Sequence, residues 1–129
     1  MRLSKRIAGA AATLASAAAL TVTAQTGAHA STTADWLSKG DTGSGVSCVQ
    51  VAINYAHNWW PGSVATVRTD AMFGQLTANG VVAIQRIYGL SQDGIVGPRT
   101  GDRLWQIIHS FDPKGELHPD CYWDLPTLS

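Results

Sequence analysis

The chain has 129 residues, about the length of one domain. Hydrophobic residues make up 45% of it and charged residues 14%, which indicates a globular protein and excludes a highly charged disordered chain. Nine basic and nine acidic residues cancel, but three of the bases lie in the first six positions. Without residues 1–30, six bases would face nine acids, a net charge of −3. Such a charge argues against binding to nucleic-acid phosphates or to an anionic membrane surface.

Residues 1–30 have the pattern of a secretory signal peptide. A basic start is followed by an uncharged, alanine-rich stretch from Ile7 to Val22, and Ala28-His29-Ala30 is a small-x-small cleavage site. The alternative, a membrane anchor, fits less well because the stretch is short and polar residues follow it. We therefore expect Ser31 to begin the mature chain, and we expect the protein to be secreted.

Cys48 and Cys121 are the two cysteines of the sequence. An even pair in a small exported domain predicts one structural disulfide bond. The bond would close a loop of roughly 73 residues and contribute about 4 kcal/mol in the chain-entropy description. The alternative is a Cys–His metal site with His57 or His118, but no CxxC or HxxxH spacing supports it. Neither a metal nor a cofactor is expected.

Apolar residues recur at helical spacing in three segments, Val46–Ala56, Val81–Tyr88 and Leu104–Phe111. Pro61 and Gly89 end the first two helices, and Pro98 suits the first position of the third because its missing N–H costs nothing there. Residues 57–69 are expected to form a loop that carries two adjacent tryptophans. No segment alternates as a strand does, so the sequence predicts an all-α protein.

A short motif occurs twice, 23 residues apart, each time before a predicted helix. The copies are Asp70-x-x-Phe73-Gly74-x-x-Thr77 and Asp93-x-x-Val96-Gly97-x-x-Thr100. The aspartate can accept backbone N–H groups two residues on, and the apolar residue can enter the core. The glycine permits a sharp turn into the helix, and the threonine can bond free backbone groups of its first turn. The motif is therefore predicted to be structural and to direct two helices.

Three sequence blocks follow one another between residues 37 and 105. They are Leu37-x-x-Gly40-Asp41-x-Gly43-x-x-Val46-x-x-Val49-Gln50, Asp70-x-x-Phe73-Gly74-x-x-Thr77-x-x-Gly80-Val81-x-x-Ile84-Gln85 and Gly89-Leu90-x-x-Asp93-Gly94-Ile95-Val96-Gly97-Pro98-x-Thr100. In this order they resemble the helical peptidoglycan-binding domain, a three-helix module attached to many bacterial cell-wall hydrolases. The resemblance implies a compact three-helix bundle that binds cell-wall polymer and has no catalytic role.

The sequence departs from this family at several positions. Ala71 and Gln75 stand where the family usually has glycine and proline, and Gly80 and Ile84 stand where it favours alanine and phenylalanine. Gly80 lies inside the second predicted helix, where glycine costs about 1 kcal/mol of helix propensity, so its small size is expected to permit a close helix contact. The stretch before Asp70 is also a few residues longer than usual.

The expected organisation has four parts. Residues 1–30 form the signal peptide, residues 31–36 a short lead, residues 37–109 the peptidoglycan-binding-like domain, and residues 110–129 a tail tied to the first helix by the disulfide.

The expected function is non-catalytic binding of peptidoglycan, through its glycan or its stem peptide, outside the cell or at the cell wall. A separate secreted hydrolase is a further candidate partner. The alternative is a protein-interaction module that partners or regulates a separate exported enzyme. Nucleic acid and, after signal cleavage, membrane are not expected partners.

Catalysis by this chain is not expected. His57, His109 and His118 lie in different segments and none has a histidine partner at helical spacing. The chain has a single glutamate, Glu116, and the aspartates of the repeated motif are explained as turn formers, so a pair of carboxylates across a cleft is not indicated.

Aromatic residues give the stronger signal for a ligand, because their rings can stack on the apolar faces of sugars. Trp59 and Trp60 are adjacent, so one is expected to be buried and the other exposed. Guanidinium groups can bind carboxylates and amide side chains can bind sugar or peptide groups. For each candidate the alternative is core packing or a solvated surface position. The predicted ligand-binding residues are Tyr55, Trp59, Trp60, Arg68, Gln75 and Asn79.

Overall fold

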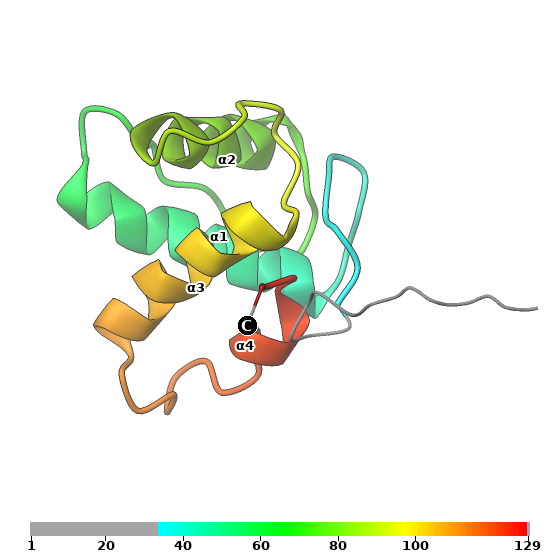
Figure 1. The fold of residues 1–129 in the computed structure, drawn as a ribbon, viewed down its shortest axis with the longest axis vertical. Helices are drawn as coiled ribbons and strands as arrows, with labels where there is room; N and C mark the ends of the chain where they lie inside the picture. The colour runs from blue at the N-terminus through cyan, green and yellow to red at the C-terminus, as the bar shows by residue number, and fades with distance from the viewer. Residues whose placement is uncertain (1–33, 129) are drawn as a thin grey trace, which may run out of the picture.

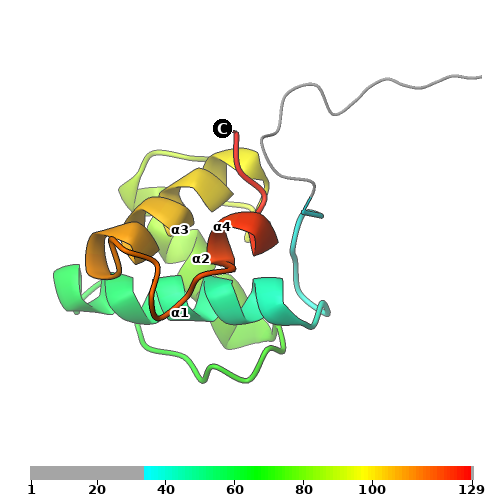
Figure 2. The same ribbon diagram turned by 90° about the horizontal axis from the view of Figure 1, so that it is seen from below.

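The computed structural model describes residues 34–128, which contain three main helices and one short helix. Helix α1 contacts each of the others. Figures 1 and 2 show α2 and α3 packed around α1, with α4 beside the first half of α1. The predicted all-α bundle is confirmed. The helices span Ser44–Trp59 (α1), Gln75–Ile87 (α2), Pro98–Phe111 (α3) and Cys121–Asp124 (α4).

The core lies around α1 because this helix buries side chains towards all of its neighbours. Val46, Val49 and Ile53 are fully buried. α2 approaches α1 closely at Gly80, where an added Cβ would lie 2.7 Å from Cδ1 of Ile53. The glycine inside α2 therefore allows the close helix contact expected from the sequence, which offsets its poor helix propensity.

The structure differs from the predicted elements in two places. α1 continues through residues 57–59, which were expected to belong to the following loop, and Trp60 forms its C-cap. The physical reason is that Pro61 restricts mainly the residue directly before it, so the helix persists until that point. The four-residue helix α4 was not predicted, since one turn is too short to show an apolar period.

Each copy of the repeated motif is held by a buried glutamine from the preceding helix. Nε2 of Gln50, on α1, donates to Asp70 Oδ1, to the Met72 carbonyl and to Thr77 Oγ1 at 3.0, 3.1 and 3.1 Å. Its Oε1 accepts the backbone N–H of Ala71 at 3.0 Å. This single amide therefore fixes the turn before α2.

Gln85, on α2, makes the same set of bonds to the second motif. Its Nε2 donates to Asp93 Oδ1, to the Ile95 carbonyl and to Thr100 Oγ1 at 2.9, 3.0 and 3.1 Å, and its Oε1 accepts the Gly94 N–H at 3.0 Å. Both glutamines are 1% exposed. An unsatisfied buried amide would be costly, so each glutamine requires the turn that satisfies it.

The roles predicted for the motif are partly correct. Both aspartates accept the N–H two residues on, and Phe73 and Val96 are buried. The prediction for Gly74 and Gly97 was wrong, because both have extended φ values near −95° rather than a conformation that favours glycine.

The left-handed position of each turn is instead the residue after the aspartate. Ala71 has φ of 61° and Gly94 has φ of 71°. The threonine hydroxyls were expected to bond backbone groups. In the structure they accept hydrogen bonds from the glutamine side chains.

The C-terminal segment is fastened to the bundle at several points. The disulfide joins Cys48 of α1 to Cys121 of α4. Asp112 accepts three backbone N–H bonds from residues 116–118, each 2.9 Å long. Burial raises the pKa of Asp112, but these bonds outweigh it and leave the pKa below its usual value. At the end, Pro126 packs directly on Gly101 of α3, a position with no room for a Cβ.

The left-handed turn residues predict a pair of opposite stability effects. Ala71→Gly should raise the free energy of unfolding by about 1 kcal/mol, because it removes the strain of a Cβ at positive φ. Gly94→Ala should lower it by a similar amount, since an added Cβ there meets nothing closer than 3.6 Å and only the strain remains. Thermal unfolding should show shifts of roughly 4–8 °C in opposite directions. Shifts of the same sign would contradict this account.

Docking of the tail is tested at Gly101. In Gly101→Ala the new methyl group would collide with the carbonyl of Pro126, so the tail must move and the free energy of unfolding should fall by about 2 kcal/mol or more. Limited proteolysis of the oxidised protein should then cut the tail faster than in the unsubstituted protein. Gly62→Ala is the matched control, because nothing lies within 4 Å of its added Cβ. Equal cleavage in both variants would contradict tail docking at this glycine.

Candidate functional site

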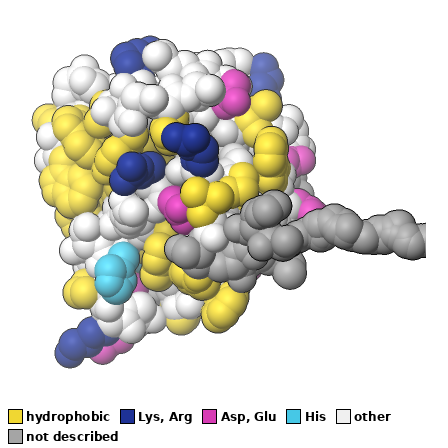
Figure 3. Space-filling model, viewed as in Figure 1, with side chains coloured by type: hydrophobic (Ala, Val, Ile, Leu, Met, Phe, Trp, Pro, Cys, Tyr) yellow, Lys and Arg dark blue, Asp and Glu magenta, His cyan; other side chains and the backbone are white. Residues whose placement is uncertain are grey.

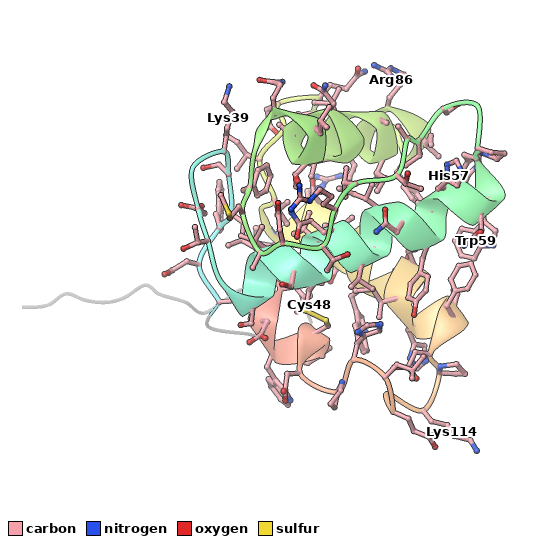
Figure 4. The ribbon with its side chains drawn as sticks, turned by 180° about the vertical axis from the view of Figure 1, so that it is seen from behind. Lys39, Cys48, His57, Trp59, Arg86 and Lys114 are labelled. Carbon is pink, nitrogen blue, oxygen red and sulfur yellow. A yellow bond between two sulfur atoms is a disulfide. The ribbon has the colours of Figure 1, made fainter. Side chains whose placement is uncertain are left out.

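A groove runs between the extended segment 63–72 and the exposed side of α2. It consists of two hollows of about 270 and 150 Å³ that share Val67 and Leu76 as common walls. Figure 4 shows the segment crossing in front of α1 before it turns into α2. We call this surface the α2 groove. The side chains that matter for its chemistry are Val67, Arg68, Met72, Gln75, Leu76 and Asn79.

The segment that forms one wall is held to α1 by side-chain hydrogen bonds. Asn54 donates from Nδ2 to the Val67 carbonyl at 3.0 Å and accepts the Val67 N–H at 2.8 Å. Nδ1 of His57 is 2.6 Å from the Val64 carbonyl, so this nitrogen carries the proton. These contacts fix the backbone of the segment against α1 as one wall of the groove.

The α2 groove combines exposed apolar side chains with polar groups. Met72 and Leu76 are 61% and 70% exposed, so both apolar side chains are open to a ligand. Beside them Lys39 Nζ donates to Gln75 Oε1, and Gln75 Nε2 donates to Asn79 Oδ1, both at 2.8 Å. Arg68 is exposed on the opposite wall. The arrangement offers apolar contact, amide donors and acceptors, and cations for a carboxylate.

The structure brings three of the six predicted ligand-binding residues together. Arg68 and Gln75 line the first hollow of the α2 groove, and Asn79 lines the second. Met72 and Leu76 were not predicted. Leu76 carried a signal, because it lies out of phase with the apolar period Val81–Tyr88 and therefore had to point away from the core.

The three predicted aromatic residues lie elsewhere, in a cluster at the end of α1. Tyr55 stacks on Phe111 with ring centroids 4.7 Å apart, and its hydroxyl is 3.1 Å from His118 Nε2. Trp59 contacts the same Phe111, at 5.1 Å. None of the three lines the α2 groove.

The two adjacent tryptophans differ in exposure, as expected, although neither is fully buried. Trp59 is 44% exposed, whereas Trp60 is partly buried and packs edge-on against Tyr88 at 5.9 Å. Trp60 is therefore mainly a packing residue. Trp59 is the more exposed of the two, although its ring also contacts Phe111 and Trp60.

The histidines considered for metal or catalytic roles do not converge. Within residues 34–128, no group of three or more His, Cys, Asp or Glu side chains is placed to hold a metal ion. His57 and His118 are engaged as described above, and His109 packs against Trp105 at 5.5 Å. Both cysteines are in the disulfide, so the alternative Cys–His site is not formed.

Comparison with known proteins finds a family that the sequence of this region matches. Residues 42–104 match the family described as putative peptidoglycan binding domain. These residues belong to that family. The match confirms the resemblance predicted from the sequence. The matched residues include both turn motifs and all residues that line the α2 groove.

One curated relative is the zinc D-Ala-D-Ala carboxypeptidase of Streptomyces albus G. It is 35% identical over 71 residues, which is 55% of this chain and 26% of the relative. The chain thus spans about a quarter of the relative's length. No solved structure matches the chain. No helix within residues 34–128 is long and apolar enough to cross a membrane.

Asp70, at the base of the α2 groove, predicts a pH dependence. The Gln50 amide, the Met72 N–H and nearby Arg68 hold its pKa below the ordinary value of 3.8. Because the folded pKa is depressed, the carboxylate stabilises the fold fully above pH 3.8 and loses this effect as pH falls through the folded pKa. Urea unfolding midpoints should therefore fall less between pH 6 and pH 3 in Asp70→Asn than in the unsubstituted chain. Parallel changes in both proteins would contradict this assignment.

Proposed function

We propose that the α2 groove is the site at which this peptidoglycan-binding domain holds cell-wall polymer, without catalysis, in an exported protein. The observation that carries the proposal is the pairing of two exposed apolar side chains, Met72 and Leu76, with Arg68, Gln75 and Asn79 inside the segment that matches the family. The segment on which the export prediction rests, residues 1–30, lies outside the described residues.

The chemistry of peptidoglycan suits these groups. Its N-acetylated sugars present methyl groups, which Met72 and Leu76 can cover, and amides, which Gln75 and Asn79 can bond. Its stem peptide presents carboxylates, for which a guanidinium such as Arg68 supplies charge-assisted hydrogen bonds. A shallow groove of this size binds weakly, and retention at a wall would come from dense repeated sites.

Trp59 is proposed as a second contact for glycan, because it is the exposed member of the predicted aromatic residues. Tyr55 and Trp60 support it through the aromatic cluster. The alternative function, a protein-interaction module, would be favoured by an exposed apolar patch around Trp59, Trp60 and Val64. Val64 is fully buried, so that patch shrinks to the Trp59 ring and its half-buried neighbour.

The proposal is tested by sedimentation of the oxidised chain with insoluble peptidoglycan sacculi. Saturable binding without release of soluble fragments is expected. Arg68→Ala and Leu76→Ala should each raise the Kd roughly ten-fold, because each removes a central contact worth about 1.4 kcal/mol. Trp59→Ala should weaken binding by a smaller factor.

The matched control for Arg68→Ala is Arg86→Ala, which also removes one positive charge. Arg86 lies on α2, at an exposed position outside the groove (Figure 4). It should bind like the unsubstituted chain. No saturable binding by the unsubstituted chain would overturn the peptidoglycan proposal. Loss in Trp59→Ala with full binding in Arg68→Ala and Leu76→Ala would place the site on the aromatic cluster.

A further inference from the structure

The repeated motif builds a second groove on the other side of the bundle. This surface consists of two hollows of about 300 and 390 Å³ that share Leu90 and Arg99. The shared walls of the α2 groove are Val67 and Leu76, and adding the repeat offset of 23 to these positions gives Leu90 and Arg99. We call the second surface the α3 groove.

The correspondence extends along both grooves. Residues 70, 72, 74, 75 and 77 line the first hollow of the α2 groove, and residues 93, 95, 97, 98 and 100 line its counterpart. Residues 79, 80 and 83 line the second hollow, and residues 102, 103 and 106 line its counterpart. The Gln50 and Gln85 bonds hold both turns in one geometry, so the duplication is a property of the backbone.

The side chains that fill the duplicated backbone are different. Arg99 takes the position of Leu76, and Arg103 takes the position of Gly80. Arg103 is positioned by its bond to Gln106 Oε1, at 3.0 Å, and by the Tyr88 ring, whose centroid lies 5.0 Å from its Cζ. Figure 3 shows basic side chains near each other on the face that α3 occupies in Figure 1.

Two further features complete the α3 groove. Trp36, 64% exposed, forms a wall that packs over Gly97, where an added Cβ would lie 3.5 Å from the ring. Asp93 and Asp102 are the acids in the groove. Oδ1 of Asp93 accepts bonds from Gln85 Nε2 and from the Ile95 N–H at 2.9 and 3.0 Å, and Oδ1 of Asp102 accepts the Leu128 N–H at 3.1 Å. Both carboxylates are thus hydrogen-bonded within the fold. Arg99 is exposed and Arg103 is half-buried, and both line the second hollow.

We propose that the α3 groove is a second binding site, specific for the carboxylate-bearing stem peptide of peptidoglycan. Arg99 and Arg103 would bind a carboxylate, and Trp36 would cover the apolar part of the same peptide. The inference rests on the proposed function, because it gives the same polymer a second contact on one domain. Two contacts to one polymer would raise the overall affinity above that of either groove.

The test is a titration of the isotope-labelled chain, followed by amide chemical shifts. The probe is a soluble disaccharide–tetrapeptide with free carboxylates, and the comparison probe is the same compound with its carboxylates amidated. Amides of residues 90–106 should shift with the free acid, with an apparent Kd of their own. Amidation of the probe should weaken binding at this groove at least ten-fold. It should weaken binding at residues 67–79 by a smaller factor, because Arg68 is one contact among several in the α2 groove.

Substitutions separate the two grooves. Arg99→Gln should weaken the α3 groove several-fold, and Arg99→Gln with Arg103→Gln at least ten-fold, without changing the affinity at the α2 groove. Arg86→Gln, the matched loss of one charge outside both grooves, should change neither. The dispersion of the amide spectrum reports whether the double variant is folded, and the single variant tests the proposal if it is not.

The outcomes distinguish this inference from the proposed function. Shifts at residues 67–79 without shifts at 90–106 would overturn the second site alone. Equal affinity for the amidated probe at the α3 groove would overturn carboxylate recognition. Shifts at 90–106 without shifts at 67–79 would support the second site and overturn the α2 groove as the main one. No shifts at either groove would overturn both.

Discussion

The structure depends on two buried glutamine side chains, each of which satisfies every polar group of its amide with one turn. Gln50 and Gln85 cannot be buried without donors and acceptors at the right positions, and the aspartate, carbonyl, threonine and backbone N–H of the following motif supply them. Each turn sets the angle at which the next helix leaves, so the arrangement of α2 and α3 around α1 follows from this network.

The same network explains why a binding surface arises twice. α2 follows the turn that Gln50 holds, and it also carries Gln85, which holds the next turn. The two copies of the helix–turn–helix unit therefore share α2. The backbone of the turn is fixed by the glutamine bonds, whereas the side chains on its outer side make few bonds to the fold. Leu76 and Arg99 occupy one repeat position with opposite chemistry, which is possible because this position faces solvent.

Sequence patterns predicted the helices well, because their signals are local. Pro98 and Gly89 mark ends that the structure places within one or two residues, and the predicted buried face of α1 is confirmed at Val46, Val49 and Ile53. The patterns did not reveal the strained alanine after Asp70, since its backbone angle is imposed by a bond from another helix. Nor did the patterns show that the six predicted ligand-binding residues lie on two different surfaces. Tyr55, Trp59 and Trp60 belong to the aromatic cluster, whereas Arg68, Gln75 and Asn79 line the α2 groove.

By itself the sequence determined the all-α class, the repeated turn, the pairing of its two cysteines and the likeness to a peptidoglycan-binding domain. Hydrophobic periodicity, turn chemistry and the presence of two cysteines were sufficient for these predictions. Each depends on residues close in the sequence or on the number of cysteines. Only the tertiary structure decided which groups share a groove. Asn54 holds Val67 across 13 residues, and Pro126 rests on Gly101 across 25. Such contacts arise from packing of whole helices, which no local pattern encodes.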